Sequence, residues 1–272
     1  MKHTLRDVVV QTEHSTGCLS GRAPHLIPTG IERLDNTFGG LSPGIVTVLG
    51  ALDGTGKSTM SLYMAFERAK SGHRTAVLST QDPADVVGVR LLSYMTGING
   101  LNVRRGSLSE FDRARLARAG EELGRNEDIL TYFPSGRLQP VLHDMEEAAS
   151  EGCDFIFIDY LQNLHIAGFR GDRRNEIDRM LSDIRDCAAK HNLAVMLLSQ
   201  MRRLPPGFDR DYTRSDLKES STIGETARLV LILNKDRKDA ALTHCVVDKS
   251  SWGGDNVVAS FRRATSGMLV PV

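Results

Sequence analysis

One short segment, Ala51-Leu-Asp-Gly-Thr-Gly-Lys-Ser-Thr59, holds the residue types that bind phosphate groups. Its glycines let backbone N–H groups turn toward phosphate oxygens without a Cβ clash. Lys57 can reach the β- and γ-phosphates of a nucleotide, and the Ser58 hydroxyl can hold Mg²⁺. The segment follows an apolar run and precedes a helical pattern, as a P-loop requires, although Ala51 stands where glycine is usual. The predicted phosphate-binding residues are Gly54, Thr55, Gly56, Lys57, Ser58 and Thr59.

A second oxygen ligand for a metal ion comes from Asp159, which ends the apolar run Phe155-Ile-Phe-Ile158. Such a run is typical of a central strand in a parallel sheet, because both faces of that strand are buried. The carboxyl ends of parallel strands meet at one edge of an open α/β sheet, where ligands bind. We therefore expect Asp159 to lie beside the P-loop and to share Mg²⁺ with Ser58.

Strand patterns alternate with amphipathic helix patterns from residue 28 onward. Strands are expected at 45–49, 75–79, 155–158, 195–198, 229–233, 245–247 and 257–261. Helices are expected at 58–70, 82–94, 110–124, 139–151 and 174–191. This alternation predicts an α/β domain with a mainly parallel central sheet. The last strands follow one another without helices and predict an antiparallel C-terminal edge.

The 272 residues carry 34 Lys+Arg and 34 Asp+Glu, so any contact with nucleic acid must come from local basic patches. Hydrophobic residues at 40% and charged residues at 25% argue against a disordered, collagen-like or disulfide-scaffold protein. No apolar run suits a membrane span, and the N-terminus lacks a signal-peptide pattern. The four widely spaced cysteines are expected to be reduced thiols in a cytoplasmic protein.

Residues 1–26 form a predicted lead-in, and residues 27–272 form the predicted domain. The lead-in has a short apolar stretch, Val8–Val10, among polar residues, and Ser15–Gly21 contains residues that interrupt a helix. Two interpretations stay open for it: a flexible terminus, or an arm or linker that docks on a neighbouring subunit.

Two basic segments follow predicted strands and are interpreted as loops. The first is Phe169–Arg174, and the second is 200–218, which has five basic residues against three acidic ones and is interrupted by Pro205–Gly207. Such loops can follow a phosphate backbone, and several subunits would multiply the contacts. The alternative is an ordinary solvated loop in each case, because the excess of positive charge is small.

Several stretches together resemble the RecA-like ATPase domain of the DnaB family of hexameric replicative helicases. They are, in order, Ile27–Asp35 with Gly39–Gly44, Ala51–Thr59 (Walker A), Ile158-Asp-Tyr-Leu-Gln162 (Walker B), Leu198-Ser-Gln200 and Ser215–Ser220. A further segment, Lys249–Asp255, resembles the related phage primase–helicases. The resemblance covers residues 27–272, and the order and spacing of the stretches make it specific.

The resemblance implies a role for each matched residue. Lys57, Ser58 and Asp159 would bind the phosphates and Mg²⁺ of ATP or another NTP. Gln200 would report the γ-phosphate to the DNA-facing loop, and Lys249 would reach the ATP of a neighbouring subunit. Together with the basic segments, the resemblance predicts that DNA is contacted by Arg173, Arg174, Arg202, Arg203, Arg210, Lys218, Glu219 and Ser221.

Two positions depart from the family's pattern. Gln81 stands where the family has a Glu that polarises the attacking water, and a carboxamide cannot accept a proton at neutral pH. Asp82 follows it, but neighbouring side chains of a strand point to opposite faces, so alternation does not place Asp82 beside Gln81. Ser251 replaces an Arg that would act in trans, a contribution of about 10³–10⁵ in rate. The candidates to replace that Arg are Arg237, Arg262 and Arg263.

These observations favour an ATP-driven helicase that pulls single-stranded DNA through a homohexameric ring, with primase or a loading protein among the expected partners. The alternative is an ATP-binding protein with impaired hydrolysis that associates with or loads a helicase and uses nucleotide as an assembly switch. A third interpretation is another RecA-like ATPase, such as a recombinase or a clock-type ATPase. Asp159–Gln162 and Ser215–Ser220 favour the first two interpretations.

Overall fold

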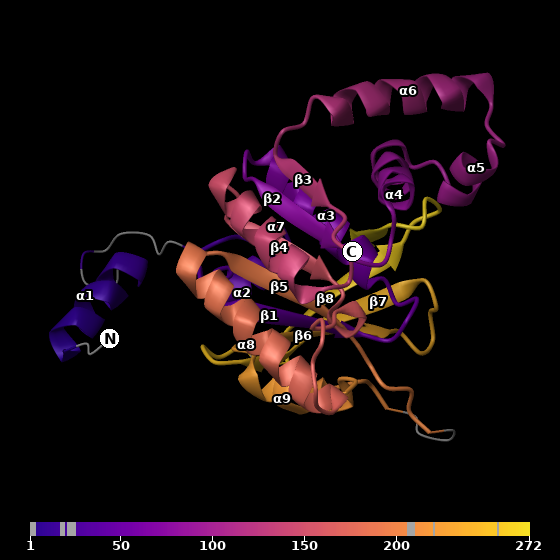
Figure 1. Ribbon diagram of the computed structural model, residues 1–272. Helices are drawn as coiled ribbons and strands as arrows, with labels where there is room; N and C mark the ends of the chain where they lie inside the picture. The colour runs from indigo at the N-terminus through magenta and orange to yellow at the C-terminus, as the bar shows by residue number, and fades with distance from the viewer. Residues whose placement is uncertain (1–3, 17–19, 21–25, 206–209, 220, 255) are drawn as a thin grey trace.

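The computed structural model describes residues 4–16, 20, 26–205, 210–219, 221–254 and 256–272. Its centre is a nine-stranded sheet with the spatial order β3-β2-β4-β5-β1-β6-β7-β8-β9 (Figure 1). The strands are β1 (Val46–Ala51), β2 (Thr75–Ser79), β3 (Ile129–Tyr132), β4 (Phe155–Asp159), β5 (Ala194–Gln200), β6 (Leu229–Lys235), β7 (Leu242–Ser250), β8 (Val258–Arg263) and β9 (Leu269–Pro271).

Pairing within the sheet changes at β6. Neighbouring strands from β3 to β6 run parallel, whereas β6, β7, β8 and β9 pair in an antiparallel manner. The predicted α/β class is therefore confirmed, including the antiparallel C-terminal edge. Because β1, β2, β4 and β5 are parallel neighbours, the segments that follow them all leave the sheet at the same edge.

Helices surround this sheet. The α-helices are α1 (Leu5–Thr16), α2 (Glu32–Phe38), α3 (Lys57–Lys70), α4 (Ala84–Thr96), α5 (Gly100–Arg105), α6 (Glu110–Gly124), α7 (Leu138–Ser150), α8 (Arg173–His191) and α9 (Ser221–Thr226). Two short 3₁₀ turns, η1 (Leu161–Asn163) and η2 (Arg214–Asp216), lie in the connections that follow β4 and β5. No helix in these described ranges combines the length and apolar character needed to cross a bilayer.

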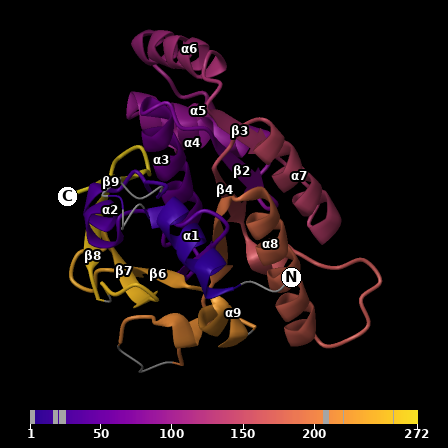
Figure 2. The same cartoon turned by 90° about the vertical axis from the view of Figure 1, so that its left-hand side faces the viewer.

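Successive residues of the central strands bury their side chains on opposite faces of the sheet, as the period of two requires. In β4, Phe155 and Phe157 join the cluster formed with α2, α3 and α4, while Ile156 and Ile158 join the cluster formed with α7, α8 and α9. Figure 2 shows these two helix layers on either side of the sheet. Burial on both faces explains the uninterrupted apolar runs in the sequence.

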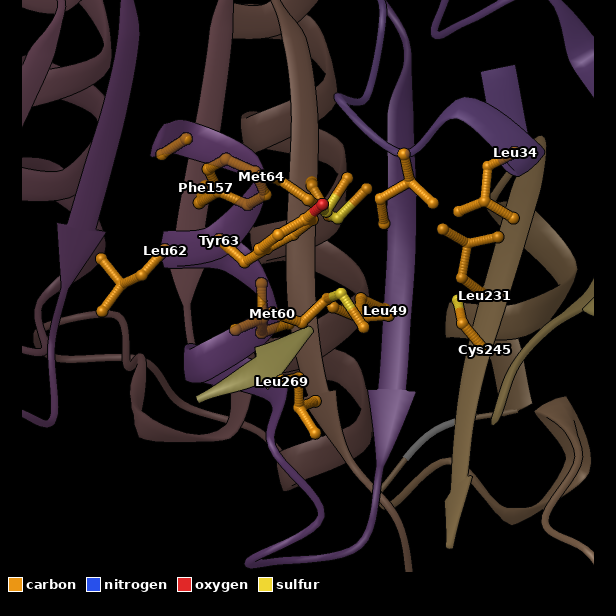
Figure 3. Close-up of a cluster of buried hydrophobic side chains, with 14 of the residues drawn as sticks. Leu34, Leu49, Met60, Leu62, Tyr63, Met64, Phe157, Leu231, Cys245 and Leu269 are labelled. Carbon is orange, nitrogen blue, oxygen red and sulfur yellow. The ribbon is translucent and has the colours of Figure 1, made fainter. Parts of the chain in front are cut away.

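Helix α3 anchors the P-loop to this core. Met60, Tyr63 and Met64 project from it into the cluster drawn in Figure 3, where they meet Leu49 of β1 and Phe157 of β4. All of these side chains are buried. The first turn of α3 is therefore fixed relative to the ends of β1 and β4, which is the rigidity that a phosphate site needs.

The lead-in contains a helix that the sequence patterns did not predict. Helix α1 begins after Thr4, whose hydroxyl accepts a hydrogen bond from the Asp7 N–H at 3.2 Å, while the Asp7 carboxylate accepts one from the Thr4 N–H at 2.8 Å. This reciprocal cap satisfies N–H groups that a helix start leaves unpaired. Figure 1 draws α1 away from the sheet, with Leu5 and Val10 exposed.

Three of the cysteines are free, buried thiols, namely Cys153, Cys187 and Cys245. Cys18 lies outside the described residues.

Candidate nucleotide site and nucleic-acid loops

The P-loop connects β1 to α3 with two glycines in the left-handed region. Gly54 has φ 72° and Gly56 has φ 122°, conformations that side chains strongly disfavour. A Cβ on Gly56 would also lie 2.8 Å from the Leu269 side chain. No side chain caps the start of α3, so the first N–H groups of the helix remain available to an anion.

Lys57 is buried although it carries an ammonium group. Its Nζ donates to the Ala51 carbonyl oxygen at 3.1 Å and lies 3.7 Å from an Asp53 carboxylate oxygen. Burial lowers the pKa of Lys57, and attraction to Asp53 and Asp159 opposes that shift. A buried cation at a helix N-terminus is electrostatically suited to phosphate, because a phosphate would replace part of its lost hydration.

Asp159 ends β4 beside the first turn of α3. Its side chain is almost completely buried, and this burial raises the pKa of its carboxyl group, while a hydrogen bond with the Ser58 hydroxyl lowers it. Ser58 and Asp159 thus bring a hydroxyl and a carboxylate together, the oxygen donors that Mg²⁺ takes. The donor set fits a hydrated Mg²⁺ ion that also contacts nucleotide phosphates.

These groups surround a hollow of about 420 Å³, a volume within the range of small-molecule sites. Five of the six predicted phosphate-binding residues line it; Thr55 is buried instead, and its carbonyl accepts a 2.9 Å hydrogen bond from Arg263. The other polar or charged lining residues are Asp53, Gln81, Asp82, Arg90, Ser93, Asp159, Arg263 and Ser266.

The segment after β2 brings both Gln81 and Asp82 to this hollow. The strand ends at Ser79, and the chain bends over residues 80–82. Strand alternation therefore does not apply at Asp82, which is where the argument from alternation was wrong. The carboxylate of Asp82 forms an ion pair with Arg90 of α4.

Gln200 lies at the end of β5, directly beside Ala51 in the register of the sheet. Gln200 is not among the described residues that line the hollow. Its side chain lies near Tyr160, where it acts to lower the pKa of that phenol against the larger, raising effect of burial. Its N–H donates to Gln162 Oε1 at 2.9 Å, and its carbonyl accepts from the Lys218 N–H at 2.9 Å. Gln200 thus joins the end of the strand next to the P-loop to the predicted DNA loop.

That loop is organised around Asp216, whose side chain is fully buried. Its carboxylate binds Arg210 at 2.6 Å and Arg202 at 3.2 Å, and it caps η2 through the Thr213 N–H at 3.1 Å. Hydrogen bonding from Arg210 lowers the pKa of Asp216 to about 2. Two of the arginines predicted to contact DNA are thus held by a shared acid, with their side chains 41% and 61% exposed.

The second basic segment meets the first. Arg173, at the start of α8, donates to a Glu219 carboxylate oxygen at 2.9 Å and to the Gln162 carbonyl at 2.8 Å. Lys218 Nζ lies 3.7 Å from the other oxygen of Glu219. Arg174 and Arg203 are exposed, whereas the side chain of Ser221 and residues 206–209 lie outside the described part of the chain. The structure therefore joins these two segments into one basic surface at the carboxyl edge of the sheet.

Lys249 lies at the other end of the parallel strands, near the residues where β1 and β6 begin. It pairs with Val230 near the start of β6, and Leu229 pairs with Thr47 at the start of β1, whereas the P-loop follows the end of β1. Lys249 Nζ donates to the carbonyls of Gly224 and Glu225 at 3.0 and 2.7 Å. Lys249 is therefore remote from the nucleotide hollow of its own chain.

Three arginines were proposed from the sequence to replace the Arg that the family has at the position of Ser251. Each of them pairs with a group away from Ser251. Arg237 pairs with Asp211 and Arg262 pairs with Asp239. Arg263 lines the nucleotide hollow of its own chain and donates a hydrogen bond to the Thr55 carbonyl.

Sequence reasoning missed Arg228, whose carbonyl accepts a 2.9 Å hydrogen bond from the Ser251 N–H. Its charge helps to lower the pKa of Lys249, after burial and Arg214. Arg228, Lys249 and Ser251 line a second hollow of about 580 Å³. Arg228 becomes a candidate only because its backbone is hydrogen-bonded to that of Ser251 in the folded chain.

Comparison of the sequence with curated proteins finds replicative helicases. The chain is 28% identical over 238 residues to "Replicative DNA helicase DnaC" of Bacillus subtilis, an alignment that covers 85% of this chain and 52% of that protein. It is 26% identical over 261 residues to "Replicative DNA helicase DnaB" of Geobacillus stearothermophilus, covering 92% of this chain and 58% of that protein. The chain thus spans about half the length of the curated relatives that it matches.

Comparison of the structure finds the same architecture in solved proteins. The "ATPase Domain of G40P" superposes with a TM-score of 0.86 at 20% identity and full coverage of both chains. A structure entitled "Crystal structure of the RadB recombinase" superposes with a TM-score of 0.56 at 19% identity, covering 89% of this chain and 98% of that one. These similarities establish the RecA-like fold.

The match to a protein family distinguishes a helicase-type domain from other RecA-like ATPases such as recombinases. Residues 27–264 match the family "DnaB-like helicase C terminal domain". The match includes the P-loop, Asp159, Gln200, the basic loops and Lys249. The resemblance identified from the motifs is confirmed, and the chain belongs to the family of DnaB-like helicase C-terminal domains.

Proposed function

We propose that this domain is an ATP-driven translocase that moves along single-stranded DNA during replication. One observation carries the proposal: the P-loop hollow and the basic surface lie at the same edge of the sheet, joined through Gln200 and Gln162. A conformational change at the nucleotide has a short path to groups that can hold a phosphate backbone. The family membership supports the same activity.

The nucleotide site is suited to phosphoryl transfer from ATP. Lys57 and the N–H groups of the P-loop would neutralise the β- and γ-phosphates. Ser58 and Asp159 would hold Mg²⁺, which supplies charge stabilisation at the phosphate oxygens. Gln81 lies at the wall of the hollow, where a carboxamide can orient a water molecule.

DNA would be held by the basic surface formed by the loops. Arg203, Arg210 and Lys218 are exposed and can approach phosphates. Glu219, paired with Arg173, would position that arginine rather than bind the backbone itself. The surface carries only a small excess of positive charge in one chain, so several subunits around a central channel would be needed for firm binding.

The proposed assembly is a homohexameric ring with ATP at each subunit interface. Lys249 and Arg228 lie at the edge of the sheet opposite to the P-loop, so they can serve only a neighbouring chain's phosphates. Helix α1, with its exposed apolar side chains, would be the arm that docks on a neighbour. Primase or a loading protein would be a further partner, since the solved protein entitled "The Structure Of A DnaB-Like Replicative Helicase And Its Interactions With Primase" shares the fold with a TM-score of 0.84.

A forked-duplex unwinding assay tests this proposal. ATP-dependent strand separation is expected for the wild-type protein and should be lost in Lys57→Ala. Lys218→Ala should weaken binding to single-stranded DNA, whereas Lys190→Ala is the matched control, because Lys190 pairs with Glu146 outside the basic surface. Binding of ATP and DNA without strand separation would instead favour the second candidate, a nucleotide-switched factor that associates with or loads a helicase. The replacements at Gln81 and Ser251 are the observations that keep this candidate open.

A further inference from the structure

The turn after β2 is built so that the carboxylate of Asp82 lies deeper than the side chain of Gln81. Both residues line the nucleotide hollow, but Gln81 is exposed, whereas the Asp82 side chain is only 18% exposed. Of these two residues, Asp82 is thus the more deeply placed, and its carboxylate can accept a proton.

Hydrogen bonds fix this turn at both of its ends. The Asp82 N–H donates to Ser79 Oγ at 3.1 Å, and Ser79 Oγ donates to the Asp82 carbonyl at 2.8 Å. The Thr80 N–H donates to the Asp159 carbonyl at 2.8 Å, and the Thr80 hydroxyl donates to the same oxygen at 2.9 Å. The position of Asp82 is therefore tied directly to the strand that ends in Asp159.

Charged groups on two elements lie near Asp82. Arg90, from α4, forms the ion pair with it, and Arg90 also lines the hollow. Asp159, at the end of β4, is close enough for the charge of Asp82 to raise the pKa of the Asp159 carboxyl group. On α3, a hydrogen bond with Ser58 and the positive charge of Lys57 both act to lower the pKa of Asp159. Asp82 is thus one of three aspartates that line the hollow, with Asp53 and Asp159, and it lies near the one that suits a metal.

We propose that Asp82 is the catalytic carboxylate of this ATPase, replacing the group that Gln81 cannot supply; this inference rests on the proposed hydrolysis of ATP. The oxygen of a water molecule forms a bond to the γ-phosphorus, and the bond between that phosphorus and the β–γ bridging oxygen breaks. The electron pair of the broken bond stays on the β-phosphate of ADP. Asp82 receives the proton of the attacking water, and the products are ADP and inorganic phosphate.

The ion pair with Arg90 is compatible with this role. The transition state of phosphoryl transfer is loose, so orientation of the water matters more than the strength of the base. A γ-phosphate in the hollow would compete with Asp82 for the guanidinium of Arg90, which leaves the carboxylate free to face the water. Gln81 keeps a supporting role as a hydrogen-bonding partner of the same water.

Single-turnover and steady-state ATP hydrolysis of three variants test the inference. Asp82→Asn should lower kcat by about a hundredfold or more, since a positioned acid–base group contributes about 10²–10⁴. Its affinity for a fluorescent ATP analogue should stay within about threefold of the wild-type value. The double variant with Gln81→Glu and Asp82→Asn should recover most of the rate, because it returns a carboxylate to the adjacent position. Asp85→Asn, an exposed change outside the hollow, is the matched control and should hydrolyse ATP at the wild-type rate.

The outcomes separate this inference from the proposed function. If the wild-type protein turns over and Asp82→Asn does so equally well, the inference is wrong and the ATPase remains. A slow Asp82→Asn that binds nucleotide but is not rescued by Gln81→Glu would show that Asp82 acts only by holding Arg90, which also overturns the inference. A wild-type protein that binds ATP without turnover would contradict the proposed hydrolysis itself, and Asp82 would then perform no such step.

Discussion

The backbone N–H of Lys218 donates a 2.9 Å hydrogen bond to the carbonyl oxygen of Gln200, so the main basic loop leaves and rejoins the tip of β5 at one point. One residue further into the loop on each side, Met201 and Leu217 form an antiparallel β-bridge. Gln162 clamps this point, because its amide nitrogen donates to Ser199 Oγ at 2.9 Å and to the Lys218 carbonyl at 3.2 Å. The end of β5 and the base of the basic loop are therefore held together by hydrogen bonds.

Gln162→Ala should separate the two activities of the domain. It removes the side-chain hydrogen bonds to Ser199, Gln200 and Lys218, and none of these three residues is among the described residues that line the nucleotide hollow. We expect basal ATP hydrolysis within about twofold of the wild-type rate and a several-fold loss of its stimulation by single-stranded DNA. Hydrolysis measured against DNA concentration checks this, and full stimulation in the variant would show that the clamp carries no signal.

Asp216→Asn should loosen the basic loop and remove an acid-sensitive contribution to stability. The pKa of Asp216 is lowered from 3.8 to about 2 in the folded chain, mainly by its hydrogen bond with Arg210. A lowered pKa stabilises the fold above the unfolded pKa, and this contribution is lost as the pH falls from about 4 to about 2. Since both arginine partners are partly exposed, we expect a loss of about 1–2 kcal/mol at neutral pH.

Thermal unfolding between pH 2 and pH 6 measures this effect. The difference in Tm between the wild-type protein and Asp216→Asn should shrink as the pH falls toward 2. Asp211→Asn is the control, because Asp211 is exposed and its carboxylate pairs across the surface with Arg237. A Tm difference that does not change with pH would show that the ionised Asp216 carboxylate does not stabilise the loop.

Trans-complementation tests the cations at the far edge of the sheet. Lys249→Ala and Arg228→Ala should each lower ATP hydrolysis at least tenfold while keeping nucleotide binding, because neither residue reaches the hollow of its own chain. Mixing either variant with Lys57→Ala should restore activity, since mixed interfaces then combine an intact P-loop with intact cations. Arg262→Ala, which loses an exposed pair with Asp239, should hydrolyse normally. Mixtures as inactive as their parents would argue against action in trans.

The regular elements were largely predictable because they follow local patterns. The strand at 75–79 and the helix at 110–124 have the bounds that periodicity and turn residues indicated. Short elements escaped this reasoning: β3 has four residues, all partly exposed, so it lacks a clear alternation. Helix α1 was missed because its reciprocal cap at Thr4 and Asp7 outweighs the mostly polar composition that follows.

The phosphate site was predictable for a similar reason, since its residues are nearly contiguous. Asp82 and Arg228 were not, because each depends on a tertiary relationship. Asp82 enters the hollow only because β2 ends at Ser79, and Arg228 gains significance only as the cross-strand neighbour of Ser251. Neither relationship can be predicted from the spacing of the residues in the sequence.

Steady-state ATP hydrolysis, measured with and without single-stranded DNA and with Lys57→Ala as the blank, tests the central proposal most directly. We expect turnover that DNA stimulates several-fold and that the Lys57→Ala variant lacks. Such a result would mean that the groups at Asp82, Arg228 and Lys249 offset the replacements at Gln81 and Ser251. Binding of ATP with no turnover above the blank, in the presence or absence of DNA, would contradict an ATP-driven translocase.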